Sequence, residues 1–391
     1  MKLSPRIQAT ATPPIPAARA WAARYQGQAG PAIDLTQAVP GYPPHADLLA
    51  KLAEAAGNPA NAGYGPIDGE AALRTALAED TARFYGADIT PADVVITAGG
   101  NLAFSMVMAA LLGQGDAVAL PTPWYFNHQM ALTMLGASVQ PLPCHAEDGF
   151  LPIVAEARAL LAAGARALVL VTPNNPTGAV YPPALIAELA EACRTHGAWL
   201  VIDETYRDFL APAQSPPHAL FQSPAWRDHV IHLYSFSKAY CVPGHRVGAV
   251  LCGPAFRTEL LKALDTWQIC PPRAAQAALA WAVPNLLPWR LGNRDIMATR
   301  AAAFATAVAP LTNWRLEALG AYFAYMRLPA AAPDAVQSAE ILAAEQGLML
   351  LPGPFFGPGQ QRHLRLAFAN VGLEAIAALP ARLLALEAPR P

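Results

Sequence analysis

Short apolar runs rich in β-branched residues alternate with helix-like segments from about residue 46 onward, and this alternation constrains the fold more than any other feature. Helix-like segments such as Leu102–Leu112 and Pro183–Thr195 separate several of the runs. Near-continuous apolar strands between helices are typical of a mostly parallel sheet covered on both faces. We therefore predict an α/β domain around a seven-stranded sheet. Its strands would be Asp93–Thr97, Ala117–Pro121, Ser138–Pro143, Ala167–Thr172, Trp199–Asp203, Val230–Tyr234 and Val247–Cys252.

The pattern changes after residue 272, and the rest of the chain predicts a smaller α/β domain. Leu291–Leu311 has the length of one long helix that joins two domains, and Ala321–Leu328 and His363–Ala369 are strand-like. The first residues are rich in Pro and Ala and lack such a pattern. We expect an arm at residues 1–44 that packs with the small domain, a large cofactor-binding domain at 45–290 and a small C-terminal domain at 291–391.

Composition excludes several classes of function. The formal net charge of −2 provides no electrostatic reason to bind nucleic acid or an anionic membrane. The five cysteines are scattered and never form a CxxC pair, so we expect reduced thiols and no metal site. No stretch approaches the roughly 20 apolar residues that span a bilayer, and the N-terminus does not resemble a signal peptide. We expect a soluble, cytoplasmic protein with an extensive subunit interface, because only 14% of its residues are charged.

Candidate site residues lie just beyond the ends of five of the predicted strands. In open α/β sheets, ligands bind beyond the carboxyl ends of the strands. The segments at these ends are Gly99-Gly100-Asn101, Trp124-Tyr125, Asn174-Asn175-Pro176-Thr177-Gly178, Asp203-Glu204-Thr205-Tyr206 and Ser235-Phe236-Ser237-Lys238. Their shared position predicts a single site at one edge of the sheet.

Lys238 is one of only four lysines among 26 basic residues. Arginine cannot be deprotonated in proteins, whereas a desolvated lysine amine can attack a carbonyl and form a Schiff base. Because the chain prefers arginine so strongly, Lys238 could be a lysine because its function requires a primary amine. The alternative is a surface lysine in a biased composition.

The other strand-end residues have both a chemical and a structural interpretation. Gly99 and Gly100 could let a phosphate approach a helix start, or could form an ordinary turn. Asp203 could pair with a protonated pyridine nitrogen, or could cap a helix. Trp124 or Tyr125 could stack on a flat ring, and Tyr206 could donate to a ring oxygen, or all three could be packed aromatics.

In combination, these residues resemble the class I/II aminotransferases, which are pyridoxal-phosphate enzymes of the aspartate aminotransferase fold (fold type I). Ser235-Phe236-Ser237-Lys238 with Gly244-His245-Arg246-Val247-Gly248 resembles the cofactor-lysine motif of that family. The similarity extends over most of the chain. It includes Tyr64-Gly65-Pro66 with Gly69 and Leu73-Arg74, Ala98-Gly99-Gly100-Asn101, Asn174-Asn175-Pro176-Thr177-Gly178, Asp203-Glu204-Thr205-Tyr206 and Arg365-Leu366-Ala367-Phe368.

The resemblance implies a role for each matching residue. Lys238 would hold pyridoxal 5'-phosphate as a Schiff base, Asp203 would pair with the ring nitrogen, and Asn175 and Tyr206 would bond the ring oxygen. Trp124 would stack on the ring, with Tyr125 as the alternative. Arg365 would grip the substrate α-carboxylate. Tyr64 would reach the phosphate of the neighbouring subunit in a homodimer. The remaining phosphate contacts would come from Gly99, Gly100, Asn101, Ser235, Ser237 and Arg246.

Three features depart from the family pattern. Cys241 stands where a glycine, serine or other small residue is usual, and a thiol is small enough to fit. Ala38, within Gln37-Ala38-Val39-Pro40-Gly41, stands where a glycine backbone often faces the substrate. No second arginine is placed by these motifs against a substrate side-chain carboxylate, which disfavours a dicarboxylate substrate.

The resemblance implies an amino-acid aminotransferase that works by a ping-pong mechanism with a 2-oxo acid acceptor. The aromatics Trp124, Tyr125, Phe126 and Tyr64 favour a neutral or aromatic substrate. The alternatives on the same scaffold are a C–S β-lyase, a decarboxylase or an oxidase, because one fold hosts many reactions. A non-catalytic, cofactor-binding regulator is a further alternative, but residues 1–44 are too short and proline-rich for a DNA-binding module.

Overall fold

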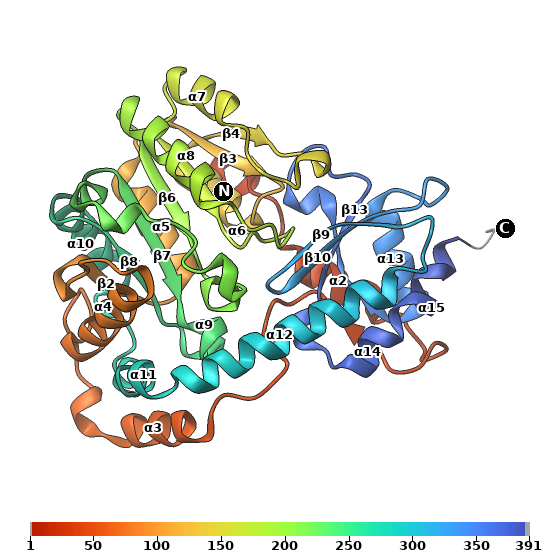
Figure 1. Ribbon diagram of the computed structural model, residues 1–391, viewed down its shortest axis with the longest axis horizontal. Coiled ribbons are helices and arrows are strands. Elements are labelled where there is room, and N and C mark those ends of the chain that lie inside the picture. Colours follow the sequence, from red (N-terminus) through yellow and green to blue (C-terminus); the bar gives the residue numbers. More distant parts are fainter. Residues whose placement is uncertain (1, 388–391) are drawn as a thin grey trace.

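The computed structural model describes residues 2–387, which form a large α/β part and a smaller one joined by a long helix (Figure 1). The large part is built on a seven-stranded sheet with the order β2-β8-β7-β6-β5-β3-β4, in which β8 runs antiparallel to the other six strands. Each strand ends within one residue of its predicted bounds, so the predicted fold class is confirmed. The strands are β2 (Val94–Thr97), β3 (Ala117–Thr122), β4 (Ser138–Pro143), β5 (Ala167–Val171), β6 (Trp199–Asp203), β7 (Val230–Ser235) and β8 (Gly248–Leu251).

Helices cover both faces of this sheet, because successive strand residues point to opposite sides and both sides are apolar. Ile96 and Ile202 belong to one buried cluster, whereas Val95 and Val201 belong to the other. The first face is covered by α4 (Ala71–Tyr85), α7 (Val154–Ala162), α8 (Pro183–Thr195) and α11 (Arg273–Asn285), with α3 (Ala46–Gly57) outside α11. The second face is covered by α5 (Gly100–Leu111), α6 (Phe126–Leu135) and α10 (Pro254–Gln268).

The smaller part is an antiparallel sheet with the order β12-β13-β10-β9, packed against helices. The predicted strand-like runs contain β10 and β13. The sequence does not predict β9, because Arg315-Leu316-Glu317-Ala318-Leu319 lacks β-branched residues and its side chains are at most half buried. The elements are β9 (Arg315–Gly320), β10 (Phe323–Arg327), β12 (Leu351–Pro352), β13 (His363–Ala367), α13 (Ala335–Gln346), α14 (Leu373–Ala377) and α15 (Leu379–Leu383).

Helix α12 (Leu287–Val308) runs from the large part to the small one, as the long cyan helix in Figure 1 shows. It begins four residues before the predicted start, with Pro288 in its first turn. Proline is tolerated there because the backbone N–H groups of the first turn have no partner within the helix. The N-terminal residues reach the small part, because β1 (Ile33–Asp34) pairs with β11 (Leu348–Met349). Helix α2 (Pro14–Ala22) packs against α13, and α1 (Pro5–Ala9) lies near α6. The boundaries at residues 44 and 290 remain a proposal.

Helices that could cross a membrane are absent from residues 2–387, since none is both long and apolar enough. Over the same residues, no group of three or more His, Cys, Asp or Glu side chains could hold a metal ion.

Candidate active site

A cavity of about 220 Å³ lies at the carboxyl ends of the large sheet's strands, where the sequence predicted a site. Twelve of the predicted site residues line it, and they come from segments more than 300 residues apart. They are Ala38, Gly100, Asn101, Tyr125, Asn175, Asp203, Tyr206, Ser235, Ser237, Lys238, Arg246 and Arg365. Three other predicted residues, Gly99, Trp124 and Tyr64, are not part of its lining.

One end of the cavity has the features of an anion site. Gly100 opens α5, a 12-residue helix whose first N–H groups have no partner within the helix. Gly99 has φ +93°, and a Cβ on it would overlap the Arg246 guanidinium, so this turn requires glycine. Ser235 and Ser237 provide two hydroxyls on the same side. Gly99 therefore acts by letting Arg246 approach rather than by lining the cavity.

Lys238 lies on α9 (Phe236–Ala239), the single helical turn that follows β7. Its Nζ donates a hydrogen bond to the carbonyl oxygen of Ala38, in the N-terminal arm. Burial lowers the pKa of Lys238 to about 8, and the cations Arg365 and Arg246 contribute, while Asp203 opposes the shift. At pH 7 about a tenth of this amine is then neutral, far more than for an ordinary lysine.

Asp203 ends β6 and presents a buried carboxylate to the cavity. Its Oδ1 accepts hydrogen bonds from the Thr205 backbone N–H (3.0 Å) and hydroxyl (2.7 Å). Its Oδ2 lies 3.2 Å from Nε2 of His128. Burial alone would raise the pKa of Asp203, but the bonds from His128 and Thr205 outweigh it and lower the pKa below its usual value. The group is a carboxylate held in its charged form.

His128 and Thr205, the two partners of Asp203, were not predicted from the sequence. His128 is on α6, 2% exposed, and its ring stacks on Phe104 at a centroid distance of 3.8 Å. A lone histidine in an apolar helix carries no signal that it will meet a strand end 75 positions away. Thr205, in contrast, follows Asp203 by two residues, a spacing at which an Asp side chain commonly bonds the backbone.

The side chains of the neighbouring aromatic residues Trp124 and Tyr125 point to different places in the structure. Tyr125 lines the cavity, and its hydroxyl donates to Asn101 Oδ1 (3.3 Å) and accepts from Asn127 (2.9 Å). Trp124 points elsewhere: its ring lies close to Gly357, outside the cavity lining. The backbone N–H of Trp124 donates to the carbonyl oxygen of Phe356 (2.8 Å), which holds Trp124 against the loop around Gly357. The geometry favours Tyr125, the alternative, over Trp124 for ring stacking.

Arg365, on β13, forms the opposite end of the cavity. It is 2% exposed; Nη1 donates to Asn175 Oδ1 (3.1 Å) and Nη2 to the Thr36 carbonyl. Its Nε–H has no hydrogen-bond partner among residues 2–387. Burial lowers the pKa of Arg365 to about 10, so the group is still cationic at neutral pH. A buried cation with an unused donor is suited to an anionic ligand.

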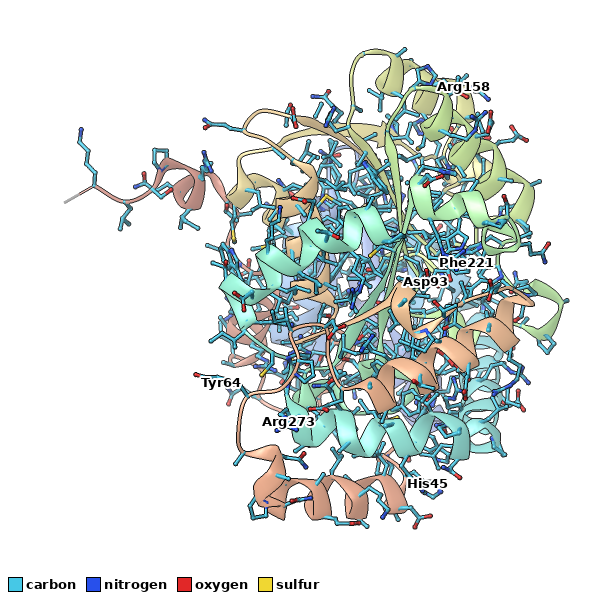
Figure 2. All side chains as sticks on the ribbon, turned by 90° about the vertical axis from the view of Figure 1, so that its left-hand side faces the viewer. His45, Tyr64, Asp93, Arg158, Phe221 and Arg273 are labelled. Carbon is cyan, nitrogen blue, oxygen red and sulfur yellow. The ribbon has the colours of Figure 1, made fainter. Side chains whose placement is uncertain are left out.

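Tyr64 is the one predicted residue that lies far outside. It is 80% exposed on the loop between α3 and α4, and Figure 2 shows it projecting outward near Arg273. Arg273 braces the same loop by donating to the Ala60 carbonyl (2.6 Å). Within one chain, therefore, Tyr64 does not contribute to the cavity.

Cys241 has φ +57°, in the left-handed region where glycine is favoured. This conformation explains why a small residue is expected after the lysine.

Residues 31–383 match the sequence model of the family described as aminotransferase class I and II. The aspartate/prephenate aminotransferase of Thermus thermophilus is 30% identical over 383 residues, which cover 94% of each chain. The aromatic aminotransferase ISS1 of Arabidopsis thaliana is 28% identical over 365 residues, or 90% of this chain and 88% of its own length.

The fold is similar to that of a solved aspartate aminotransferase from Thermus thermophilus with maleate. The TM-score is 0.89 at 26% identity, and the alignment covers 99% of this chain and all of the other.

Class I and II aminotransferases use pyridoxal 5'-phosphate, and the residues present fit this group. A turn that excludes any Cβ at Gly99, the unpaired helix start at Gly100 and the Arg246 cation suit a phosphate. The charged Asp203 carboxylate suits a protonated pyridine nitrogen, and Lys238 offers an amine of lowered pKa. The chain belongs to the class I and II aminotransferases and is a pyridoxal-phosphate-dependent aminotransferase of amino acids.

Proposed function

We propose that this enzyme moves the α-amino group of a neutral or aromatic amino acid to a 2-oxo acid in two successive half-reactions. The observation that carries the proposal is the arrangement of three groups around one cavity: the amine of Lys238, the carboxylate of Asp203 and the guanidinium of Arg365. A primary amine of lowered pKa, a fixed negative charge and a fixed positive charge are the groups that amino transfer requires.

The cofactor end of the cavity would hold pyridoxal phosphate through its own side chains. Gly99, Gly100, Asn101, Ser235, Ser237 and Arg246 would surround the phosphate. Asp203 would bond the ring nitrogen, Asn175 and Tyr206 the ring oxygen, and Tyr125 would pack on the ring face. When bound, the cofactor supplies an electron sink for the substrate's α-carbon. His128 and Thr205 are positioning residues, since they keep Asp203 oriented and charged.

The substrate end would orient the amino acid for proton removal. Arg365 would bind the α-carboxylate, and its own orientation is held by Asn175 and by the Thr36 carbonyl. The Lys238 Nζ would then take the proton from the substrate Cα. The lowered pKa of Lys238 suits this role, because a base works best when its pKa is near the working pH.

The walls beside Arg365 support a substrate with an uncharged side chain. Ile15, Val39 and Phe126 are apolar residues of the cavity lining. Within the described lining, the residues whose side chains carry charge are Asp203, Lys238, Arg246 and Arg365. All four already have a role toward cofactor, α-carboxylate or α-proton. A charged substrate side chain would therefore be desolvated without a partner.

We also propose a cytoplasmic homodimer in which Tyr64 reaches the phosphate of the neighbouring subunit. The exposure of Tyr64 supports this assembly, because a large aromatic ring that is 80% exposed gains burial on association. A Tyr64→Phe variant that keeps the dimer but binds cofactor more weakly would support the contact. Unchanged cofactor affinity would argue against it.

A steady-state assay tests the reaction type. Amino transfer requires a 2-oxo acid acceptor, so turnover of an amino acid should stop after one equivalent per site when no acceptor is present. A C–S β-lyase would instead release ammonia continuously from a sulfur amino acid without acceptor. Acceptor-independent turnover would overturn the proposal.

A further inference from the structure

A second cavity, of about 380 Å³, lies beside the active-site cavity, under the segment that links α1 to α2. It is lined by Ala11, Thr12 and Pro14 of the N-terminal arm, by α6 and by the loop around Gly357. Phe126 lines both cavities, and it is the one residue that their linings share among those described. Its ring therefore stands between the two spaces.

Phe126 stands at the substrate end of the active-site cavity rather than at the phosphate end. It is the first residue of α6 and 9% exposed. Its ring packs at 5.2 Å from that of Tyr125 and at 6.0 Å from that of Phe356. Phe356 in turn lies 5.2 Å from the guanidinium of Arg365. Ile15, one of the arm residues in the active-site lining, packs against the apolar cluster that contains Phe126.

The second cavity has the chemistry of an apolar side-chain site. Its walls are mostly apolar, its polar groups are uncharged, and none of the lining residues described is ionisable. The apolar lining is Ala11, Pro14, Trp124, Phe126, Met130, Pro354, Phe355, Gly357 and Pro358, and the polar lining is Thr12, Gln129 and Gln361. An aromatic or long aliphatic group could lose water there without leaving a buried charge unpaired.

We propose that Phe126 is a specificity-determining residue: its ring closes the substrate end of the active site and sets the length of side chain that fits. The second cavity is an apolar extension of the substrate site, which becomes continuous with it when the ring is removed. The inference rests on the proposed function, because it concerns the side chain of the amino acid that Arg365 and Lys238 would hold.

The test compares Phe126→Ala with the wild type, using alanine and phenylalanine as amino donors. We expect the ratio of kcat/KM for phenylalanine to that for alanine to rise about tenfold or more, in line with what hydrophobic pockets discriminate. The matched control is Phe355→Ala, which enlarges only the second cavity and should leave the ratio unchanged. Adding Ala11→Trp to Phe126→Ala should refill the extension and reverse the gain.

A binding measurement tests the role of Phe126 independently of which reaction the enzyme catalyses. The Kd of 3-phenylpropanoate relative to that of propanoate, followed by the absorbance of the bound cofactor, should fall in Phe126→Ala by a similar factor. Phe126→Leu, a smaller change to the packed cluster, serves if Phe126→Ala does not fold, and should give a smaller shift in the same direction. Unchanged ratios in the variant that folds, or an equal shift in Phe355→Ala, would overturn the proposal. Failure of the wild type to transaminate any amino acid would instead refute the proposed function.

Discussion

The two ends of the active-site cavity are built in different ways. The cofactor end lies at the carboxyl edge of the large sheet, where the turn at Gly99, the strand end at Asp203 and the helical turn at Lys238 meet. The substrate end combines the N-terminal arm, the start of α6 and β13 of the small sheet, from Ile15 to Arg365. The groups proposed for the reaction chemistry are therefore held mainly by one sheet, whereas the proposed choice of substrate depends on how three separate segments pack.

The two ends also differ in the environment of their arginines. Arg246 is exposed in the single chain, whereas Arg365 is 2% exposed and lies between Phe323 and Phe356. Because solvent screens charges, a contact to Arg365 is worth more than one to Arg246. Substitutions at each end should therefore affect different quantities and to different extents.

Removing the amine shared by both ends should have the largest effect. Lys238→Ala should lower turnover about 10²- to 10⁴-fold, because no other primary amine faces the cavity among the lining residues described. Steady-state assays at saturating cofactor measure this. The control is Lys262→Ala, an exposed lysine paired with Glu259 at 2.7 Å, which should retain full activity. Wild-type turnover in Lys238→Ala would contradict the account.

Substitution at the substrate end should weaken substrate use without releasing cofactor. Arg365→Ala should lower kcat/KM for the amino acid about 10- to 100-fold, the loss expected for a charge-assisted hydrogen bond. Its control is Arg327→Ala, on the neighbouring strand, whose side chain is largely exposed. Kinetics and a cofactor titration on the same preparations separate the two effects. If the Kd of the cofactor rises by the same factor by which kcat/KM falls, Arg365 also holds the cofactor. That result would contradict the separation of the cavity into a cofactor end and a substrate end.

Substitution at the cofactor end should show the reverse pattern on a smaller scale. Arg246→Ala should raise the Kd of pyridoxal phosphate about tenfold, because an exposed charge contributes less than a buried one. At saturating cofactor its KM for the amino acid should stay at the wild-type value. Equilibrium dialysis of cofactor, followed by kinetics, tests this. A raised KM with normal cofactor affinity would show that Arg246 belongs to the substrate end.

The smallest effect concerns pH. Only the neutral amine of Lys238 attacks a carbonyl, so a lowered pKa lets the cofactor-free protein capture pyridoxal phosphate at lower pH. The capture rate should rise with pH and level off above about 8, the pKa of Lys238. Arg365 helps to lower this pKa, so Arg365→Ala should move the midpoint to higher pH. Rapid-mixing absorbance measures the rate. A wild-type midpoint near 10 would contradict the inferred environment of the amine.

The difference between the cofactor end and the substrate end also explains how much of the site could be predicted from the sequence. The cofactor end consists of short motifs at strand ends, so an apolar run followed by Asp203 or by Ser235-Phe236-Ser237-Lys238 predicts both position and chemistry. The seven strands were predicted for a similar reason, since buried parallel strands are continuous apolar runs. Arg365 was placed only through its resemblance to the family.

Contacts between distant segments were not predictable. Nothing near His128 indicates that it meets Asp203. Thr36 follows β1, which pairs with β11, and Ile15 lies on α2, which packs against α13, so both reach the cavity through contacts with the small part. Trp124 and Tyr125 are adjacent, and the direction of each side chain depends on where α6 begins. These features follow from tertiary packing, which local patterns do not encode.

The most direct test of amino transfer is a single-turnover absorbance titration of the purified holoenzyme. Amino acids are added without any acceptor while the band of the lysine-bound cofactor is recorded. We expect the band to be lost, one 2-oxo acid to be released per site, and added 2-oxo acid to restore the band. Continued release of ammonia while the band persists, or the absence of such a band in protein supplied with pyridoxal phosphate, would contradict this expectation.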